Sequence, residues 1–343
     1  MNDLEFMAIA AQTASLADKA LTYENPRVGA LIVKNNQILA TGYHQKFGEE
    51  HAEINAYNHL SDKSQIEGAT LYVTLEPCAT HGKVESCART MTSWGLKQVI
   101  IGSVDPNIET HGRGIKILQN TGISVSVLDT HHSSQLNPEF YQYFKNKSPY
   151  VQLKLAMSNN GFVSQSSNKR IKLTDDIADI DVHHERAMRS AVLIGSQTFL
   201  TDSPSLTVRH GMLAHRQPIR IVIDRTGRLQ KNPSSFSEGW LVYTENKDFA
   251  LNFDNVIFMK NGLQGVLSDL FNKNIQSVMV EGGPTLITAF LKENLWHEMI
   301  GYKTNVMLPK HSLAAALPVA PPTKQLAIGN AIKSIYINQN WRK

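Results

Sequence analysis

The sequence predicts an α/β protein built from two domains. A domain usually has roughly 100–200 residues, and this chain has 343. Helix and strand patterns alternate over the first 130 residues and again after residue 150, which favours sheets with helices on both faces. Between these stretches, Asn146-Lys147-Ser148-Pro149 interrupts the pattern. We therefore expect one domain over residues 1–147 and a second over residues 148–343.

The first half begins with apolar residues at helical spacing over residues 4–19. Apolar runs over 28–33 and 38–42 are joined by Lys34-Asn35-Asn36-Gln37, which predicts a hairpin. A helical pattern over 87–94 is expected to stop at Gly95. The other expected elements are helices over 51–60, 114–120 and 135–147, and strands over 69–75, 98–102 and 123–128.

The second half repeats this alternation without an internal sequence repeat. Strands are expected over residues 151–156, 191–195, 219–224, 241–244 and 277–281. Helices are expected over 176–189, 263–271 and 284–295. Residues 310–323 are rich in Ala and Pro and are expected to form a loop.

Composition and charge exclude several classes of protein. Hydrophobic residues make up 42% and charged residues 19%, which excludes a disordered or collagen-like chain. The net charge of +4 is too small to favour a nucleic-acid partner. Two cysteines cannot form a disulfide framework and favour a reducing compartment. We find no signal-peptide pattern and no apolar run long enough to cross a membrane, so we expect a cytoplasmic protein.

His51, Cys78 and Cys87 form a candidate metal site. One imidazole and two thiolates suit zinc, and three protein ligands leave a fourth position open for catalysis. Glu53 follows His51 by two residues and could move protons there. Both cysteines are expected near helix N-termini, where the helix dipole favours the thiolate. Two alternatives stay open: inert buried cysteines, and a structural zinc site with His81 as the fourth ligand.

A His-x-Glu pair followed by Pro-Cys and a second Cys is the signature of zinc-dependent nucleoside and nucleobase deaminases. Most of these enzymes have two residues between the cysteines, whereas this chain has eight. The insert contains His81-Gly82-Lys83. With this insert, the chain resembles the bifunctional riboflavin-biosynthesis family, in which a pyrimidine deaminase is fused to a reductase.

The resemblance in the first half implies a three-layer α/β/α sandwich like that of cytidine deaminases. It implies that zinc is bound by His51, Cys78 and Cys87 and that Glu53 is the proton shuttle. It also implies that Asn25, His44, His81 and Lys83 bind the pyrimidine substrate. The motifs that carry it are Asn25-Pro26-Arg27-Val28-Gly29, Gly42-Tyr43-His44, Thr74-Leu75-Glu76-Pro77-Cys78, Asp105-Pro106-Asn107 and Gly112-Arg113-Gly114.

The resemblance in the second half implies a reductase domain with a fold similar to dihydrofolate reductase and NADPH as cofactor. It implies cofactor contacts at Met157, Lys172, Thr198, Asp202, Gly283, Pro284 and Thr285. It implies substrate contacts at Arg170, Arg186, Leu206, Arg209 and Glu281. The motifs that carry it include Gln152-Leu153-Lys154-Leu155-Ala156, Thr198-Phe199-Leu200-Thr201-Asp202-Ser203-Pro204, Leu206-Thr207-Val208-Arg209 and Glu281-Gly282-Gly283-Pro284-Thr285.

The residues of the second half agree with this in part. Small residues at 282 and 283, between a strand and a helix, let backbone amides approach an anion, although an ordinary tight turn would read the same way. No Gly-x-Gly-x-x-Gly fingerprint is present there, so a Rossmann domain is not supported. Arg186 and Arg209 suit a phosphate because a guanidinium forms paired bonds with its oxygens, although an arginine on a helix is usually solvated.

The chain departs from the family pattern at several places. Asn160 stands where the family usually has Asp, and Asn168-Lys169-Arg170-Ile171-Lys172-Leu173 replaces a segment near the cofactor. The stretch after Tyr302 lacks a usual Pro-x-Leu-Leu-Gly pattern, and Val84-Glu85-Ser86 replaces Thr-Pro-Pro before the second cysteine. These departures leave open a deaminase with a degenerate reductase domain.

The resemblance implies two reactions in sequence. The first is zinc-dependent hydrolytic deamination of 2,5-diamino-6-ribosylamino-4(3H)-pyrimidinone 5′-phosphate. The second is NADPH-dependent reduction of the ribosyl group to ribityl. Relatives are commonly dimers or tetramers, so we expect a homo-oligomer. A zinc module that binds nucleic acid is a third reading, and the small net charge speaks against it.

Overall fold

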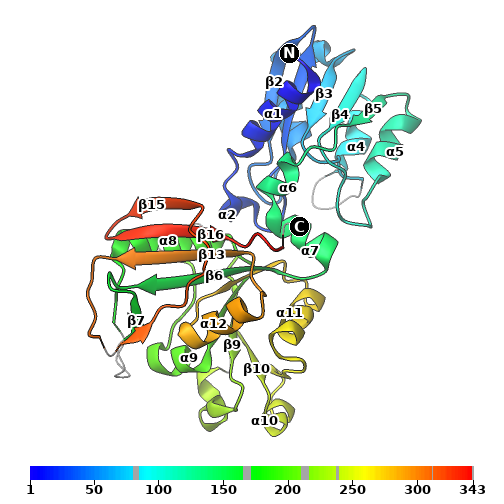
Figure 1. Cartoon of the computed structure of the whole chain (residues 1–343). Helices are drawn as coiled ribbons and strands as arrows, with labels where there is room; N and C mark the ends of the chain where they lie inside the picture. The colour runs from blue at the N-terminus through cyan, green and yellow to red at the C-terminus, as the bar shows by residue number, and fades with distance from the viewer. Residues whose placement is uncertain (80–84, 165–170, 210–215, 237–238, 311, 342–343) are drawn as a thin grey trace. The chain divides into compact units, whose positions relative to one another are not determined.

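The computed structural model describes residues 1–79, 85–164, 171–209, 216–236, 239–310 and 312–341. The chain forms two compact units, Met1–Asn146 and Lys147–Lys343. Each unit has its own sheet and its own buried apolar clusters (Figure 1). None of the helices in the described ranges is long and apolar enough to cross a membrane.

The first unit is built on a five-stranded sheet with the order β2-β1-β3-β4-β5. β1 pairs with β2 as an antiparallel hairpin, and Asn35 and Asn36 at its turn have φ values of 50° and 62°. Two consecutive left-handed residues form the turn that matches the twist of a hairpin, so the predicted hairpin is confirmed. β3, β4 and β5 are parallel to one another. The strands are β1 (Gly29–Lys34), β2 (Gln37–Tyr43), β3 (Thr70–Val73), β4 (Gln98–Ile101) and β5 (Ser124–Val127).

Helices cover both faces of this sheet, as the sequence predicts. Ala30 and Ile32 of β1 point into one apolar cluster with residues of α3, α4 and α5, whereas Leu31 and Val33 point into another with α1. Alternate residues of a strand face opposite sides, so the unit has three layers. The helices are α1 (Asp3–Ala14), α2 (Lys19–Thr22), α3 (Ala52–Asn58), α4 (Cys87–Met91), α5 (Arg113–Asn120), α6 (His132–Leu136) and α7 (Pro138–Asn146), with a short 3-10 turn, η1 (Lys63–Ile66).

Several helices are shorter than the sequence predicts, and for two of them side-chain contacts give the reason. The first pattern breaks because Ser15 caps α1 and the carboxylate of Asp18 starts α2 by accepting from the Ala20 N–H at 2.9 Å. The helix expected over 135–147 is two helices, α6 and α7. Asn137 between them uses its side-chain amide to bind the backbone N–H and carbonyl of Arg27, at 2.6 and 3.0 Å. Pro138 lacks an N–H and so can occupy only the first turn of α7.

The second unit is built on a nine-stranded sheet with the order β11-β10-β9-β8-β12-β6-β13-β16-β15. The strands from β11 to β13 are parallel, and β16 and β15 complete the sheet in the antiparallel sense. The strands are β6 (Tyr150–Met157), β8 (Ala191–Gly195), β9 (Ile219–Ile223), β10 (Trp240–Thr244), β11 (Val256–Phe258), β12 (Ser277–Val280), β13 (Glu298–Thr304), β15 (Lys324–Ile328) and β16 (Ala331–Ile337).

Apolar clusters lie on both faces of this sheet as well. Val278 and Val280 of β12 join one cluster with α11 and α12, and Met279 joins the other, where α8 and α9 pack. The helices are α8 (Asp176–Ala187), α9 (Ser196–Asp202), α10 (Lys247–Leu251), α11 (Gly262–Asn272) and α12 (Pro284–Lys292), with 3-10 turns η2 (Arg228–Lys231) and η3 (Pro233–Ser235). This arrangement confirms an α/β second domain.

The C-terminal part of the sheet was not predicted. β13, β15 and β16 have no counterpart in the sequence analysis, and the described residues of β15 are mostly exposed. A small extra sheet also pairs β7 (Phe162–Ser164) with β14 (Leu313–Ala314), and β14 lies inside the region expected to be a loop.

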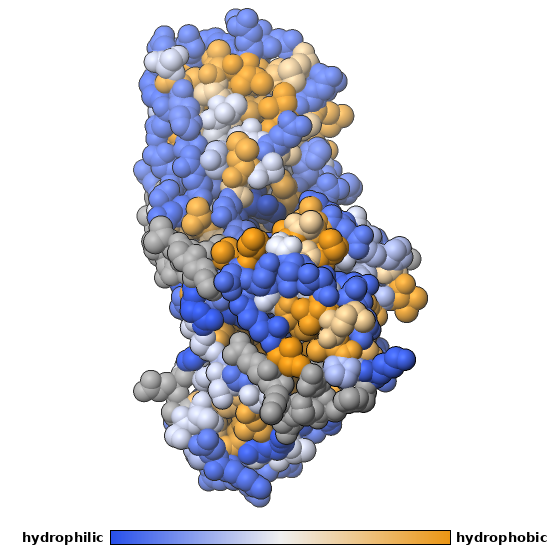
Figure 2. Space-filling model, turned by 90° about the vertical axis from the view of Figure 1, so that its left-hand side faces the viewer, coloured by the Kyte–Doolittle hydropathy of each residue, from blue (hydrophilic) through white to orange (hydrophobic). Residues whose placement is uncertain are grey.

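Figure 2 shows one face of the molecule as hydrophilic surface with separate apolar patches.

Candidate functional sites

Three candidate metal ligands from separate segments converge in the first unit. His51 precedes α3 and makes no capping bond with its side chain, Cys78 follows β3, and Cys87 begins α4. The His51 Nδ1 lies 3.5 Å from the Cys78 Sγ and 3.3 Å from the Cys87 Sγ. The three ligand atoms all lie within 4.8 Å of one another.

This geometry fits zinc. Ligand atoms at the usual zinc distances and at tetrahedral angles are about 3.5 Å apart. One imidazole and two sulfurs are donors that zinc prefers. Among the described residues, these three form a group whose side chains could hold a metal ion. The residues that the sequence analysis grouped, between positions 51 and 87, thus lie together in the structure.

Glu53 lies beside these ligands in the first turn of α3. Its side chain is buried, with 3% of the residue exposed. Burial disfavours the charged carboxylate, and the negative charge of Cys78 adds to this, so the pKa of Glu53 is raised to about 7. A carboxyl group with this pKa can both hold and release a proton near neutral pH.

The surroundings of Cys78 differ from the expectation. Cys87 is the first residue of α4, but Cys78 lies in an irregular segment and not at a helix N-terminus. Hydrogen bonds take the place of the helix dipole: the Cys87 thiol, His51 and the Cys87 backbone N–H together lower the pKa of Cys78. The thiolate is therefore stabilised by its partners in the site.

Glu76 carries a structural role that the sequence analysis did not assign. Its buried carboxylate accepts four backbone hydrogen bonds, from the N–H groups of Asp105, Gly112, Gly114 and Ile115 at 3.2, 2.9, 3.0 and 3.4 Å. A Cβ on Gly114 would lie 2.0 Å from the carbonyl oxygen of Pro77, so only glycine allows this approach. The segment before Cys78 is thereby fixed against the start of α5.

Asn25 and His44 lie together next to the metal ligands. The Asn25 Nδ2 is 3.1 Å from the His44 Nε2, and the His44 Nδ1 is 3.0 Å from the Glu50 carbonyl oxygen. The rings of His44 and His51 are 5.3 Å apart, edge to face. Burial lowers the pKa of His44, so a neutral ring can donate to Glu50 and accept from Asn25. His81 and Lys83 lie outside the described residues.

The candidate residues of the second unit gather where parallel strands end. β6, β12 and β8 are neighbours, so their carboxyl ends share one edge of the sheet, where open α/β sheets bind ligands. Met157 ends β6, Thr198 and Asp202 lie on α9 after β8, and Gly283 and its two successors lie at the start of α12. A Cβ on Gly283 would lie 3.9 Å from the Thr198 Oγ1, so these two segments approach closely.

Glu281 is the centre of a buried charge cluster at this edge. The Arg186 Nε and Nη2 donate to its two carboxylate oxygens, the latter at 3.0 Å, and the Lys154 Nζ lies 3.3 Å from its Oε2. Burial alone would raise the pKa of Glu281, but the charges of Lys154 and Arg186 outweigh it and lower the pKa to about 2. The sequence analysis gave Lys154 no role of its own. Nothing near it in the sequence indicates that its partner, Glu281, lies 127 residues away.

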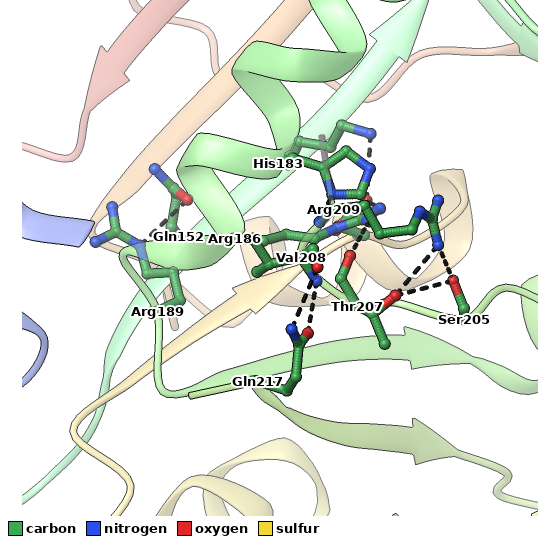
Figure 3. Close-up of polar contacts among 11 residues, drawn as sticks. Gln152, His183, Arg186, Arg189, Ser205, Thr207, Val208, Arg209 and Gln217 are labelled. Carbon is green, nitrogen blue, oxygen red and sulfur yellow. Dashed lines mark hydrogen bonds and ion pairs between the residues drawn. The ribbon is translucent and has the colours of Figure 1, made fainter. Parts of the chain in front are cut away.

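Arg209 lies on a neighbouring segment that Figure 3 shows beside Arg186. Its Nη1 donates to the hydroxyls of Ser205 and Thr207, the latter at 3.2 Å, and its backbone N–H donates to the His183 Nδ1 at 3.0 Å. The Arg186 Nη1 reaches the Thr207 carbonyl oxygen at 3.3 Å. The two arginines are thus connected through one short segment.

The remaining candidates are placed differently. Leu206 is buried and has a φ of 50°, a strained value for a residue with a Cβ. Lys172 does not join the cluster around Glu281, because its Nζ pairs with Asp176 at 2.8 Å and with Asp179 at 2.9 Å. Arg170 lies outside the described residues.

Two families match the chain. The family described as the cytidine and deoxycytidylate deaminase zinc-binding region matches residues 1–103. The RibD C-terminal domain family matches residues 149–308.

Similar proteins cover nearly the whole chain. The riboflavin biosynthesis protein RibD of Escherichia coli is 35% identical over 95% of this chain and 94% of its own length. RibD of Buchnera aphidicola is 31% identical over 99% of this chain and 100% of its own. The structure of Acinetobacter baumannii RibD superposes with a TM-score of 0.80 at 32% identity, covering 98% of each chain. A deaminase/reductase from Thermotoga maritima gives a TM-score of 0.75 at 31% identity, covering 96% of this chain and 97% of its own.

Proposed function

The chain belongs to the RibD family of riboflavin biosynthesis proteins, and on this premise we propose how its two units divide two consecutive reactions. The first unit deaminates 2,5-diamino-6-ribosylamino-4(3H)-pyrimidinone 5′-phosphate. The second unit reduces the ribosyl group of the product to ribityl with NADPH. The observation that carries the proposal is the convergence of His51, Cys78 and Cys87 beside the buried Glu53.

In the first unit, His51, Cys78 and Cys87 would hold the zinc ion. Zinc with three protein ligands supplies Lewis acidity that makes water nucleophilic near neutral pH. Glu53 then accepts the proton of the attacking water and delivers it to the departing amino group, which leaves as ammonia. A pKa of about 7 suits a group that must do both.

Asn25 and His44 orient the pyrimidine in this scheme. The Asn25 Nδ2 contacts His44, so the Asn25 Oδ1 would be the atom that accepts a hydrogen bond from the pyrimidine. His44 fixes that amide orientation and is itself fixed by the Glu50 carbonyl. His81 and Lys83 remain proposed substrate ligands on the resemblance alone.

In the second unit, Met157, Lys172, Thr198, Asp202 and the Gly283-Pro284-Thr285 segment are proposed to hold NADPH, which supplies the hydride when bound. The N-cap residue of α12, Gly283, makes no capping bond with a side chain, and this helix start suits an anionic cofactor group. Arg170, Arg186, Leu206, Arg209 and Glu281 are proposed to hold the substrate. Lys154 joins this set because its ammonium contacts Glu281.

The alternative of a deaminase with a degenerate reductase unit has no support in the comparisons, because the RibD C-terminal domain family matches residues 149–308. Lys154, Arg186 and Glu281 also form a buried charge cluster in this unit. A nucleic-acid-binding zinc module is likewise unsupported, because the relatives are biosynthetic enzymes.

The test is ammonia release from the full-length protein with and without a chelator, together with NADPH oxidation on the deaminated product. We expect Glu53→Gln to lower the rate of ammonia release about 100- to 10,000-fold while zinc stays bound, because the amide cannot carry a proton. Glu49→Gln, an exposed acid near His51, is the matched control and should leave the rate unchanged. Ammonia release that survives zinc removal or Glu53→Gln would refute the deaminase assignment.

We also propose a homo-oligomer in the cytoplasm. β15 ends the large sheet and exposes Leu326 on one face of it, and Ile332 of β16 is exposed on the other face, which supports association through this edge. Both cysteines are outside any disulfide and so can bind zinc, as a reducing compartment would allow. Sedimentation of the wild type against Leu326→Lys would test the oligomer, since a buried lysine at the interface should yield monomers.

A further inference from the structure

The turn after β6 is bound closely to the segment after β13. The Asn159 N–H donates to the Val306 carbonyl at 2.7 Å, and the Thr304 hydroxyl donates to the Met157 carbonyl at 3.2 Å. The Ala315 N–H donates to the Gly161 carbonyl at 2.8 Å. These bonds extend the contact between β6 and β13 beyond their last paired residues, Met157 and Lys303.

The side chain of Asn160 lies in the middle of this junction. Its Nδ2 donates to the Leu308 carbonyl oxygen at 2.7 Å, and its Oδ1 accepts from the Leu308 N–H at 3.1 Å. The same Oδ1 accepts from the Ser158 hydroxyl at 2.8 Å. The amide therefore binds one backbone residue of the other segment in both directions.

This pattern requires an amide and excludes a carboxylate. A carboxylate has two acceptor oxygens and no donor, so aspartate at 160 would place a negative oxygen against the Leu308 carbonyl. Leu308 and Ser158 are both buried, so water cannot readily replace the missing donor. The two bonds to Leu308 thus set a donor requirement at position 160 in this chain.

The junction adjoins the proposed cofactor site. Met157, the last residue of β6, lies three positions before Asn160, and its carbonyl is held by Thr304 within the same set of bonds. The junction also lies at the carboxyl edge of the parallel strands, where the residues of the proposed reductase site gather.

We propose that Asn160 is a positioning residue for the reductase site, whose amide holds Met157 and its turn against the Leu308 segment in the geometry that binds NADPH. This rests on the proposed reductase function. In this proposal Asn160 acts indirectly: the affinity for the cofactor depends on Asn160, although its side chain binds the Leu308 segment and not the cofactor or the substrate.

The test compares Asn160→Asp with Asn159→Asp in the full chain. Asn159 is the matched control because its side chain is exposed and the junction uses only its backbone N–H. We expect Asn160→Asp to raise the Kd for NADPH and the KM for NADPH about tenfold, with kcat changed less than threefold, through the loss of one partly buried hydrogen bond. Asn159→Asp should leave both within twofold.

A second readout does not depend on turnover. Amide hydrogen exchange at residues 305–308 should become faster in Asn160→Asp and stay unchanged in Asn159→Asp, with ammonia release in both variants reporting an intact first unit. Ser158→Ala removes the bond to the Asn160 Oδ1 and also the bond that the Ser158 Oγ accepts from the Phe162 N–H, but it keeps the pair with Leu308, so we expect a rise in the Kd smaller than that of Asn160→Asp.

The outcomes separate the two proposals. A wild-type chain that neither binds NADPH nor oxidises it refutes the reductase function. A wild type that does both, with Asn160→Asp matching Asn159→Asp in Kd and in exchange, refutes the positioning role of Asn160 alone.

Discussion

The two sites of this chain differ in what binds their charged and metal-ligating side chains. In the first unit, an imidazole and two sulfurs face one another within 4.8 Å, a set that a metal ion from solution completes. In the second unit, Glu281 already contacts Lys154 and Arg186, so the chain supplies its own counter-charges. Removing a group should therefore affect metal content and catalysis in the first site, and folding stability in the second.

The largest effect is expected from Cys87→Ser. A serine hydroxyl does not ionise as a thiol does, so the site keeps two of three ligands. We expect zinc content to fall from one ion per chain to near zero, and ammonia release to fall on the order of a thousandfold or more. Elemental analysis and the ammonia assay measure this, and NADPH oxidation by the same protein is the internal control. Full zinc occupancy in the variant would contradict the ligand assignment.

The second largest effect is expected from Glu281→Gln. The amide leaves the charges of Lys154 and Arg186 uncompensated in a place where only 16% and 12% of their side chains are exposed. Breaking a buried ion pair by removing one partner lowers the free energy of unfolding by about 3–5 kcal/mol. Denaturant unfolding followed by a probe in the second unit measures the loss. Unchanged zinc content would show that the first unit is unaffected, and unchanged unfolding would contradict the electrostatic role of Glu281.

Acid should reproduce part of that effect in the wild type. The pKa of Glu281 is about 2 in the folded chain, against an ordinary value of 4.5 for a glutamate in the unfolded chain. Because the folded-state pKa is the lower one, its stabilisation is complete above pH 4.5 and is lost as the pH falls towards 2. This amounts to about 3 kcal/mol. The difference in unfolding free energy between wild type and Glu281→Gln should shrink across this window, and a constant difference would refute the assignment.

The smallest effect is expected from Glu245→Gln. Glu245 forms a two-pronged pair with Arg225, at 2.9 and 3.0 Å, but the two side chains are 42% and 67% exposed. Solvent screens such a pair, so we expect a loss of less than about 1 kcal/mol. The same denaturant experiment measures it. A loss equal to that of Glu281→Gln would show that burial does not distinguish the two pairs.

The difference between the sites also explains which of them the sequence reveals. His51, Glu53, Cys78 and Cys87 lie within 37 residues, and their chemistry is rare enough for spacing alone to identify them. Lys154 and Glu281 are 127 residues apart, and only the pairing of β6 with β12 brings them together. Arg186 was found by its suitability for phosphate, but its contact with Glu281 was not.

The elements of the fold follow the same rule. Regular apolar patterns identified β1, β2 and β8 nearly to the residue. β15 escaped because an exposed edge strand has no strong apolar alternation. β16 was also missed, although it pairs on both sides and is mostly buried. The break between α6 and α7 escaped because it depends on Asn137 binding Arg27, a contact 110 residues away in the chain.

The carboxylate of Glu76 accepts hydrogen bonds from four N–H groups within residues 105–115. It therefore ties the segment before Cys78 to a segment that lies about 30–40 residues further along the chain. A side chain at 114 would push Pro77 away, and a shorter acid at 76 would lose its reach to Gly112. Exchanging this part of the protein with a homologue should therefore succeed only when residues 76–78 and 105–115 travel together. An amino-acid change in one of these two segments therefore restricts which residues the other segment can accept.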